Sequence, residues 1–282
     1  MPLDVQVTFI SQKINKIRWI PEEYVDTKCF LTGSWDDDVN SIKVWTLESP
    51  NEEEEVEYPR ALSEYHVDGD VTQIKFTDKN KIAVSLSSGE VKLLEISIYD
   101  KQAPPKEVYS WKKLHNYGGH MKIWDLRSQV DKPSASFLLA GDELAATCIT
   151  IHPTLPHIVL AGSESGALAV WDLRMNQFPS SLLNAHSAGV SEMQFHPENP
   201  HKLITSSVSG EIWDWNMESM TKSARGPDNQ LIWMPLEDKN AMLVNSLMPT
   251  LHKAINTVHC DKGRILCGAD NEAVYLIKNF KY

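Results

Sequence analysis

Basic residues and cysteines are scarce in this sequence, and their scarcity excludes several kinds of protein. The 282 residues carry 27 Lys and Arg against 38 Asp and Glu, a formal net charge of −11, with no basic tract. We therefore expect no direct nucleic-acid partner and no attraction to anionic membranes. The four cysteines, Cys29, Cys148, Cys260 and Cys267, include no Cys-x-x-Cys pair. This excludes a zinc ribbon and predicts buried free thiols in a reducing compartment.

Long apolar runs and catalytic motifs are also missing. No apolar stretch approaches the roughly 20 residues of a membrane-spanning helix, and Met1–Gln6 lacks the basic and apolar segments of a signal peptide. There is no nucleophile elbow, phosphate-binding loop or metal-ligand spacing, since Gly162–Gly166 is only a strand–turn–strand connection. We expect a soluble intracellular protein that is not an enzyme, inserts in no membrane, and has no catalytic residue, cofactor or metal.

Tryptophan is present in excess, with nine Trp against eight Tyr and seven Phe. The excess marks a repeat, because a Gly turn precedes a short alternating strand that ends in Trp at a constant offset. The three clear copies end at Trp124, Trp171 and Trp215, and Asp125 and Asp172 follow the first two. Weaker copies in the same frame end at Trp45, Leu94 and Tyr275.

The spacing of these six repeat ends predicts the fold. Successive ends are 49, 30, 47, 44 and 60 residues apart, and a WD repeat of about 40–45 residues forms one four-stranded blade. We therefore predict an all-β fold, a WD40-type β-propeller with six recognisable repeat ends. The 30-residue step leaves too few residues for four strands and three turns, so an incomplete blade is expected between Leu94 and Trp124. An open or distorted ring is favoured over a ring that closes with fewer blades.

The whole chain, 1–282, is predicted to be a single propeller. The alternating segment Val5–Phe9 can add a strand to the last blade and so remove exposed sheet edges, although a frayed terminus is the alternative. The predicted segments are a closing strand at 5–9, blades at 14–47 and 56–96, a remnant blade at 107–127, blades at 137–174 and 178–216, an insertion loop at 219–236, and a last blade at 239–279.

Several residues at repeat positions suggest a hydrogen-bond chain that braces a blade. His186, Ser206 and Trp215 are the expected members of this chain. The Asp that often completes it in WD repeats is replaced here by Ser165 and Ser209, which predicts weaker bracing.

Two further segments are candidate docking sites. Residues 51–57 carry five Glu, which is typical of a solvated loop; the alternative is a docking site for a basic partner. The cluster Leu231–Pro235 lies in the insertion loop. Trp233 in this cluster is either packed under the loop or an exposed anchor for a partner.

Beyond WD repeats in general, the chain resembles the WD-repeat nucleoporins of the Y-shaped scaffold complex of the nuclear pore. The segments that carry the resemblance are 9–19, 32–36 with 42–45, 182–215 and 267–275. The resemblance implies a seven-bladed propeller without catalysis, a scaffold subunit that supports pore assembly and nucleocytoplasmic transport of mRNA and protein. It also implies an α-solenoid partner within the complex, location in the nucleus at the pore, and a presence at kinetochores in mitosis. The 30-residue step departs from the family, because a third blade and most of a fourth are reduced to a remnant.

A rival interpretation rests on Trp-Asp-x-Arg, which occurs at Trp124–Arg127 and again at Trp171–Arg174. Paired copies resemble the adaptor-binding signature of WD-repeat substrate receptors in cullin–RING ubiquitin ligases. That resemblance implies that Arg127 and Arg174 reach beyond their strands to a partner surface. The signature is short and common in WD repeats, so a structural coincidence is favoured over this interpretation.

Overall fold

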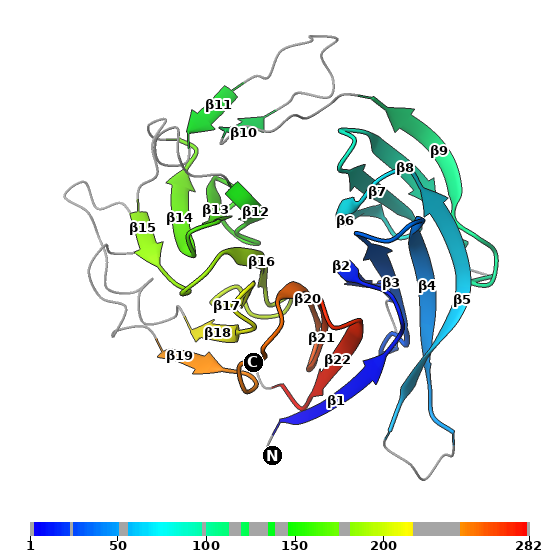
Figure 1. The fold of residues 1–282 in the computed structure, drawn as a ribbon. Coiled ribbons are helices and arrows are strands. Elements are labelled where there is room, and N and C mark those ends of the chain that lie inside the picture. Colours follow the sequence, from blue (N-terminus) through cyan, green and yellow to red (C-terminus); the bar gives the residue numbers. More distant parts are fainter. Residues whose placement is uncertain are drawn as a thin grey trace. The chain divides into compact units, whose positions relative to one another are not determined.

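The computed structural model describes residues 3–22, 25–50, 56–97, 100–112, 120–123, 135–138, 146–174, 181–216 and 243–280 (Figure 1). All regular secondary structure in these ranges is β-strand. Contacts divide the chain into two compact units, which we describe separately. The first comprises Met1–Asn116 with Ile255–Lys281, and the second comprises Tyr117–Ala254 with Tyr282.

The first unit contains three four-stranded antiparallel sheets, or blades. One blade is β2 (Ile14–Trp19), β3 (Cys29–Ser34), β4 (Asn40–Glu48) and β5 (Tyr58–Val67). The next is β6 (Val71–Asp78), β7 (Lys81–Leu86), β8 (Val91–Glu95) and β9 (Lys106–Trp111). The third joins β20 (Ile255–Asp261), β21 (Arg264–Ala269) and β22 (Ala273–Lys278) to β1 (Asp4–Phe9).

The third blade therefore takes its outermost strand from the opposite end of the sequence. β1 pairs antiparallel with β22, from Asp4 opposite Lys278 to Phe9 opposite Ala273. This pairing covers the backbone hydrogen-bonding edge of β22, which would otherwise be open to association.

The second unit contains two four-stranded blades and one two-stranded sheet. The first blade is β12 (Ala146–Ile151), β13 (Ile158–Ser163), β14 (Ala167–Asp172) and β15 (Ser181–Asn184). The second is β16 (Val190–Phe195), β17 (Lys202–Ser207), β18 (Ile212–Asn216) and β19 (Leu243–Ser246). The two-stranded sheet pairs β10 (His120–Ile123) with β11 (Ala135–Leu138).

The fold is thus an all-β β-propeller, with five four-stranded blades in the described residues. The seven-bladed pattern is not confirmed. Between Leu94 and Trp124 the described residues hold only β9, which completes the β6–β9 blade, and β10, which pairs with β11. Trp124 itself lies outside the described residues.

The described repeat ends all occupy the third strand of a blade rather than its last. Trp45 lies on β4, Leu94 on β8, Trp171 on β14, Trp215 on β18 and Tyr275 on β22. The fourth strand of each blade follows later in the chain or, for β1, precedes it. The blades are consequently offset by one strand from the predicted segments, because the Trp signal marks the third strand while the outermost strand carries none.

Each inner strand, the first strand of its blade, contains a β-bulge at the same place. The register shifts after Ile14 in β2, Val71 in β6, Ala146 in β12, Val190 in β16 and Ile255 in β20. A bulge re-aims the side chain next to it. Such repetition in five blades is the structural counterpart of the sequence repeat.

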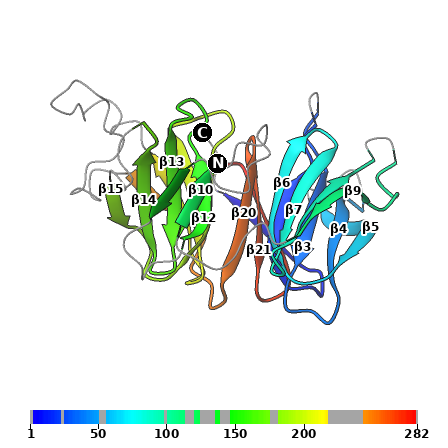
Figure 2. The same ribbon diagram turned by 90° about the horizontal axis from the view of Figure 1, so that it is seen from above.

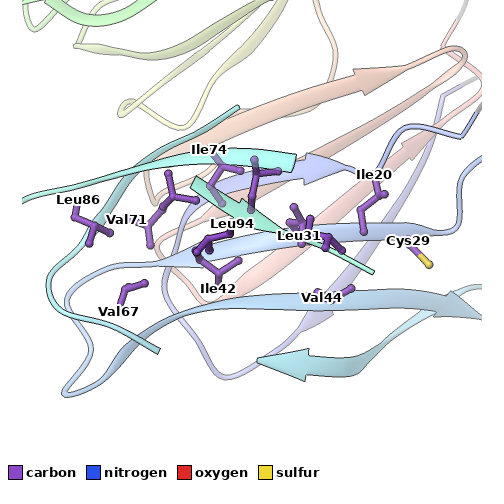
Figure 3. Close-up of a cluster of buried hydrophobic side chains, with 13 residues drawn as sticks. Ile20, Cys29, Leu31, Ile42, Val44, Val67, Val71, Ile74, Leu86 and Leu94 are labelled. Carbon is purple, nitrogen blue, oxygen red and sulfur yellow. The ribbon is translucent and has the colours of Figure 1, made fainter. Parts of the chain in front are cut away.

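The two faces of a blade have different roles in packing. We call the face that holds the described repeat-end residue (Trp45, Leu94, Trp171, Trp215 or Tyr275) the tryptophan face, and the opposite side the far face. In the first unit the tryptophan face of β6–β9, with Ile74, Ile82 and Leu94, packs on the far face of β2–β5, with Leu31 and Val44. Figure 2 shows these two blades next to each other, and Figure 3 shows Ile74 and Leu94 close to Leu31 and Val44. Burial of these side chains removes apolar area from water and holds the two blades together.

The bulged residue of one blade fills a gap above a glycine in the preceding blade. A Cβ placed on Gly33 would lie 2.4 Å from the Val71 side chain, and one on Gly268 would lie 2.5 Å from the Ile14 side chain. Gly162 beneath Val190 in the second unit repeats the arrangement at 2.7 Å. Glycine is required at these positions because any side chain would collide with the neighbouring blade.

Candidate functional site

The described residues contain no site with obvious chemistry. Among them, no group of three or more His, Cys, Asp or Glu side chains is placed to hold a metal ion. The described part of the chain also contains no helix with the length and apolar character that crossing a bilayer requires. All four cysteines are buried and free, as the sequence predicts. The candidate functional site therefore consists of the buried hydrogen-bond networks and the exposed side chains of the blades.

A hydrogen-bond network occupies the interior of the β16–β19 blade. The indole Nε1 of Trp215 donates to Oγ1 of Thr205 at 2.8 Å, and Nε2 of His186 lies 2.7 Å from the same oxygen. Nδ1 of His186 lies 3.1 Å from Oε2 of Glu211, which also accepts from Oγ of Ser209 at 2.9 Å. His186, Thr205 and Trp215 are all buried.

One assignment of protons satisfies every member of this network. If His186 carries its proton on Nδ1 and donates it to Glu211, Nε2 is free to accept the Thr205 hydroxyl proton. The Thr205 oxygen in turn accepts from Trp215. Such a chain of polarised hydrogen bonds orders the β15–β16 loop, which holds His186, over the third strand of the blade.

The structure corrects the predicted membership of this network. Ser206 was expected to bond His186 and Trp215, but its hydroxyl lies 2.8 Å from Ser191 Oγ, and Thr205 takes the predicted role. The reason is alternation, because adjacent strand residues point to opposite faces. Ser209 takes part, but Glu211 supplies the carboxylate.

Sequence reasoning missed Thr205 and Glu211, although a signal for Glu211 existed. Glu211, Trp213 and Trp215 alternate along one face of the chain, so they are neighbours on the tryptophan face. Trp213 stacks on His186 with ring centroids 4.4 Å apart and an interplanar angle of 28°. The alternation of strand residues, followed back from Trp215, predicts that Glu211 lies on the same face.

Trp45 and Trp171 occupy the same register position in their blades as Trp215, but their indole nitrogens differ in hydrogen bonding. Nε1 of Trp45 donates to Oγ1 of Thr32 at 2.8 Å, which repeats the bond between Trp215 and Thr205. In the β12–β15 blade the register places Ala161 at the corresponding position. Nε1 of Trp171 is consequently buried with no hydrogen-bond partner among the described residues.

Asp172 and Arg174, from the second Trp-Asp-x-Arg copy, bind each other. Arg174 donates from Nε to Oδ1 at 2.9 Å and from Nη2 to Oδ2 at 2.5 Å, and its backbone N–H also donates to Oδ1 at 3.0 Å. Hydrogen bonds from Arg174 lower the pKa of Asp172. The Arg174 side chain is exposed but folds back on its own strand. Trp124, Asp125, Arg127 and Trp233 lie outside the described residues.

Blades with buried Trp–Thr bonds, repeated bulges and a His-centred network define the class of protein. The chain is an all-β β-propeller whose blades repeat the tryptophan pattern of the sequence.

Comparison with known proteins adds a particular relative. The chain is similar over almost its whole length to nucleoporin Nup43. It is 26% identical to the Homo sapiens protein over 375 residues, covering 98% of this chain and 99% of the human one. For the Mus musculus Nup43 the identity is 23% over 374 residues, covering 98% of both chains. No family model matches the chain.

Proposed function

We propose that the chain is a non-enzymatic scaffold and docking subunit of the nuclear pore. The observation that carries the proposal is the similarity to nucleoporin Nup43, which extends over 98% of this chain and 99% of the human protein. A match of that extent involves the whole arrangement of repeats rather than one blade. The blade interiors support it, because their polar groups are used in bracing and form no reactive constellation in the described residues.

The finer parts of the proposal concern the assembly. We propose membership of the Y-shaped complex with an α-solenoid subunit as direct partner, support of pore assembly and transport, and association with kinetochores in mitosis. The alignments exceed the 282 residues of this chain, so about a quarter of the aligned positions have no residue here. That difference corresponds to about two WD repeats, which supports a seven-bladed family pattern shortened in this chain.

The direct test is affinity capture of the tagged full chain from cells, combined with imaging. The expected result is a nuclear rim that coincides with a pore marker and capture of Y-complex nucleoporins, with crosslinks to a helical-repeat subunit. An even cellular distribution without nucleoporins among the captured proteins would contradict the proposal. A reproducible turnover that one point substitution abolishes would contradict its non-enzymatic part.

The same capture separates the proposal from the cullin–RING alternative. Arg127→Ala and Arg174→Ala should leave nucleoporin capture unchanged. Capture of a ligase adaptor that both substitutions abolish would favour the alternative. The bidentate pairing of Arg174 with Asp172 supports a local structural role for the second motif copy.

A further inference from the structure

Three loops of the first unit lie together and share a group of acidic side chains. They join β1 to β2, β3 to β4 and β21 to β22. The β1–β2 loop contacts both others through the backbone: the Ile10 N–H donates to Glu272 O at 2.9 Å, and the Trp35 N–H donates to Lys13 O at 3.3 Å. We call the four carboxylates of these loops the acidic loop group; they are Asp36, Asp37, Asp270 and Glu272.

The acidic loop group holds more negative than positive charge. Nζ of Lys13 lies 2.5 Å from Oδ2 of Asp36. The hydrogen bond to Asp36, and then the charges of Asp270 and Asp37, raise the pKa of Lys13. The next cation that acts on Asp37 is Lys43, whose ammonium lies 3.4 Å from Glu64. One ammonium therefore serves four carboxylates, and the remaining negative charge can attract a cationic partner.

Gln12 adds a buried acceptor to this group. Its side chain is buried, with 4% of the residue exposed, and its Nε2 donates to Oγ of Ser41 at 3.0 Å. The amide also hydrogen-bonds the Asp37 carboxylate, and a carboxylate only accepts, so the amide nitrogen faces Asp37. Oε1 of Gln12 is left without a hydrogen-bond partner in the part of the chain that the structure describes. A cationic N–H donor would suit this oxygen and the carboxylate beside it.

Trp35 adds an aromatic surface to the same loops and narrows the kind of cation. Nζ of Lys13 lies 5.9 Å from the centroid of the Trp35 ring, so the site already holds a cation over an indole. No three carboxylates in the described ranges are placed to share a metal ion. A guanidinium suits such a site, because it binds carboxylates through a fork of donors and also stacks on aromatic rings.

We propose that the acidic loop group, with Gln12 and Trp35, is a docking site for an arginine-rich segment of a partner protein. One arginine takes the place of Lys13 against Asp36 and Trp35, and a second binds Asp37. Lys13 is then an internal competitor that occupies part of the site. The site is separate from the Glu-rich run at 51–57, and the inference does not depend on the proposed pore function.

The test is fluorescence anisotropy of a short labelled peptide, in which Arg alternates with Gly, titrated with the full chain. The expected result is saturable binding that weakens as salt is added. Asp36→Asn combined with Asp37→Asn should weaken binding by at least about fivefold. Asp78→Asn combined with Asp100→Asn is the matched control, because it removes the same charge from exposed positions of the same unit outside these loops. The control should leave binding unchanged.

Lys13→Met provides a second measurement that a folding defect cannot imitate. Removal of the competing ammonium should tighten binding of the peptide by at least about twofold, whereas misfolding would weaken it. A peptide with Lys in place of Arg should bind the parent chain more weakly, because an ammonium lacks the planar fork of donors.

Four results would overturn the proposal. They are the absence of saturable binding at low salt, binding that Asp36→Asn with Asp37→Asn leaves unchanged, equal weakening by the control pair, and weaker binding to Lys13→Met. Equal affinity for the Lys and Arg peptides would overturn the choice of arginine.

Discussion

The indole nitrogen of Trp215 donates a 2.8 Å hydrogen bond to the hydroxyl of Thr205 inside the β16–β19 blade. The same hydroxyl lies 2.7 Å from His186 Nε2, so one threonine serves two buried partners. Within the described part of the chain, the Thr32 hydroxyl in the β2–β5 blade bonds a single side chain, that of Trp45. Substitution of the two threonines therefore measures how much stability is lost with one or with two of these buried hydrogen bonds.

Thr205→Val should destabilise the protein more than Thr32→Val. Valine preserves the shape but leaves Trp215 and His186 without their acceptor or donor, and each orphaned buried polar group costs about 1–3 kcal/mol. Thr32→Val orphans one indole. Chemical denaturation followed by Trp fluorescence measures both, and equal shifts of the two variants would contradict the shared role of Thr205.

Ala161→Thr should stabilise the β12–β15 blade relative to Ala161→Val. Both substitutions add similar volume to the same buried site, so strain from overpacking is common to them. Only threonine can accept the unpartnered N–H of Trp171. The expected difference is about 1 kcal/mol in favour of threonine. Equal melting temperatures would show that the register equivalence with Thr205 fails at this blade.

His152 should make stability depend on pH. Burial, and then the nearby His201 and His157, lower the pKa of His152 from 6.5 to about 4. The unfolded chain therefore takes up this proton at a higher pH than the folded one. The contribution of neutral His152 to the free energy of unfolding is complete above pH 6.5 and is lost as the pH falls from 6.5 towards 4.

His152→Asn should reduce this loss of stability on acidification. Asparagine cannot titrate, and its carbonyl can accept the backbone N–H of Leu155, which now donates to His152 Nδ1 at 3.2 Å. His252→Asn, at an exposed histidine that is not among the groups acting on His152, is the control and should keep the parental slope. Thermal melts at intervals between pH 4 and 7.5 measure how the melting temperature depends on pH. Identical dependence in the parent and in His152→Asn would refute the attribution of this effect to His152.

Trp233, outside the described residues, is predicted to contact a partner. Trp233→Ala should weaken capture of the partner by about 2 kcal/mol, the scale of an aromatic interface anchor, without changing thermal stability. An equal loss of binding and stability would instead identify Trp233 as a core residue. Ala substitution of the neighbouring Met234 provides a comparison on the same segment.

The sequence predicts the third strand of a blade well and the fourth poorly. Trp45, Trp171 and Trp215 mark the third strand because a large indole at that register is buried. The outermost strands have no such requirement: β5 begins with the pair Tyr58–Pro59, and β9 exposes Val108 and Tyr109. An outermost strand with a face that is not packed against another element shows little apolar pattern in its sequence.

The candidate network shows the same limit at the level of single residues. His186 and Trp215 were predictable because repeats place them at fixed offsets. Thr205 was mistaken for Ser206, because an offset counted along the chain tolerates an error of one residue. In a strand that error reverses the face. Only the pairing of Leu203 with Trp215 settles which hydroxyl faces the indole.

The pairing of β1 with β22 has a consequence for synthesis on the ribosome. The edge strand of this blade is made well before its partner, Ala273–Lys278, which is far from it in the sequence. Until then β1 has no strand to pair with, and Val7 and Phe9 are carried through translation on an unpaired strand. Contacts of such long sequence separation form slowly. The last blade of the first unit therefore closes only after β22 has been made, and the interval before closure is when chaperones have access to it.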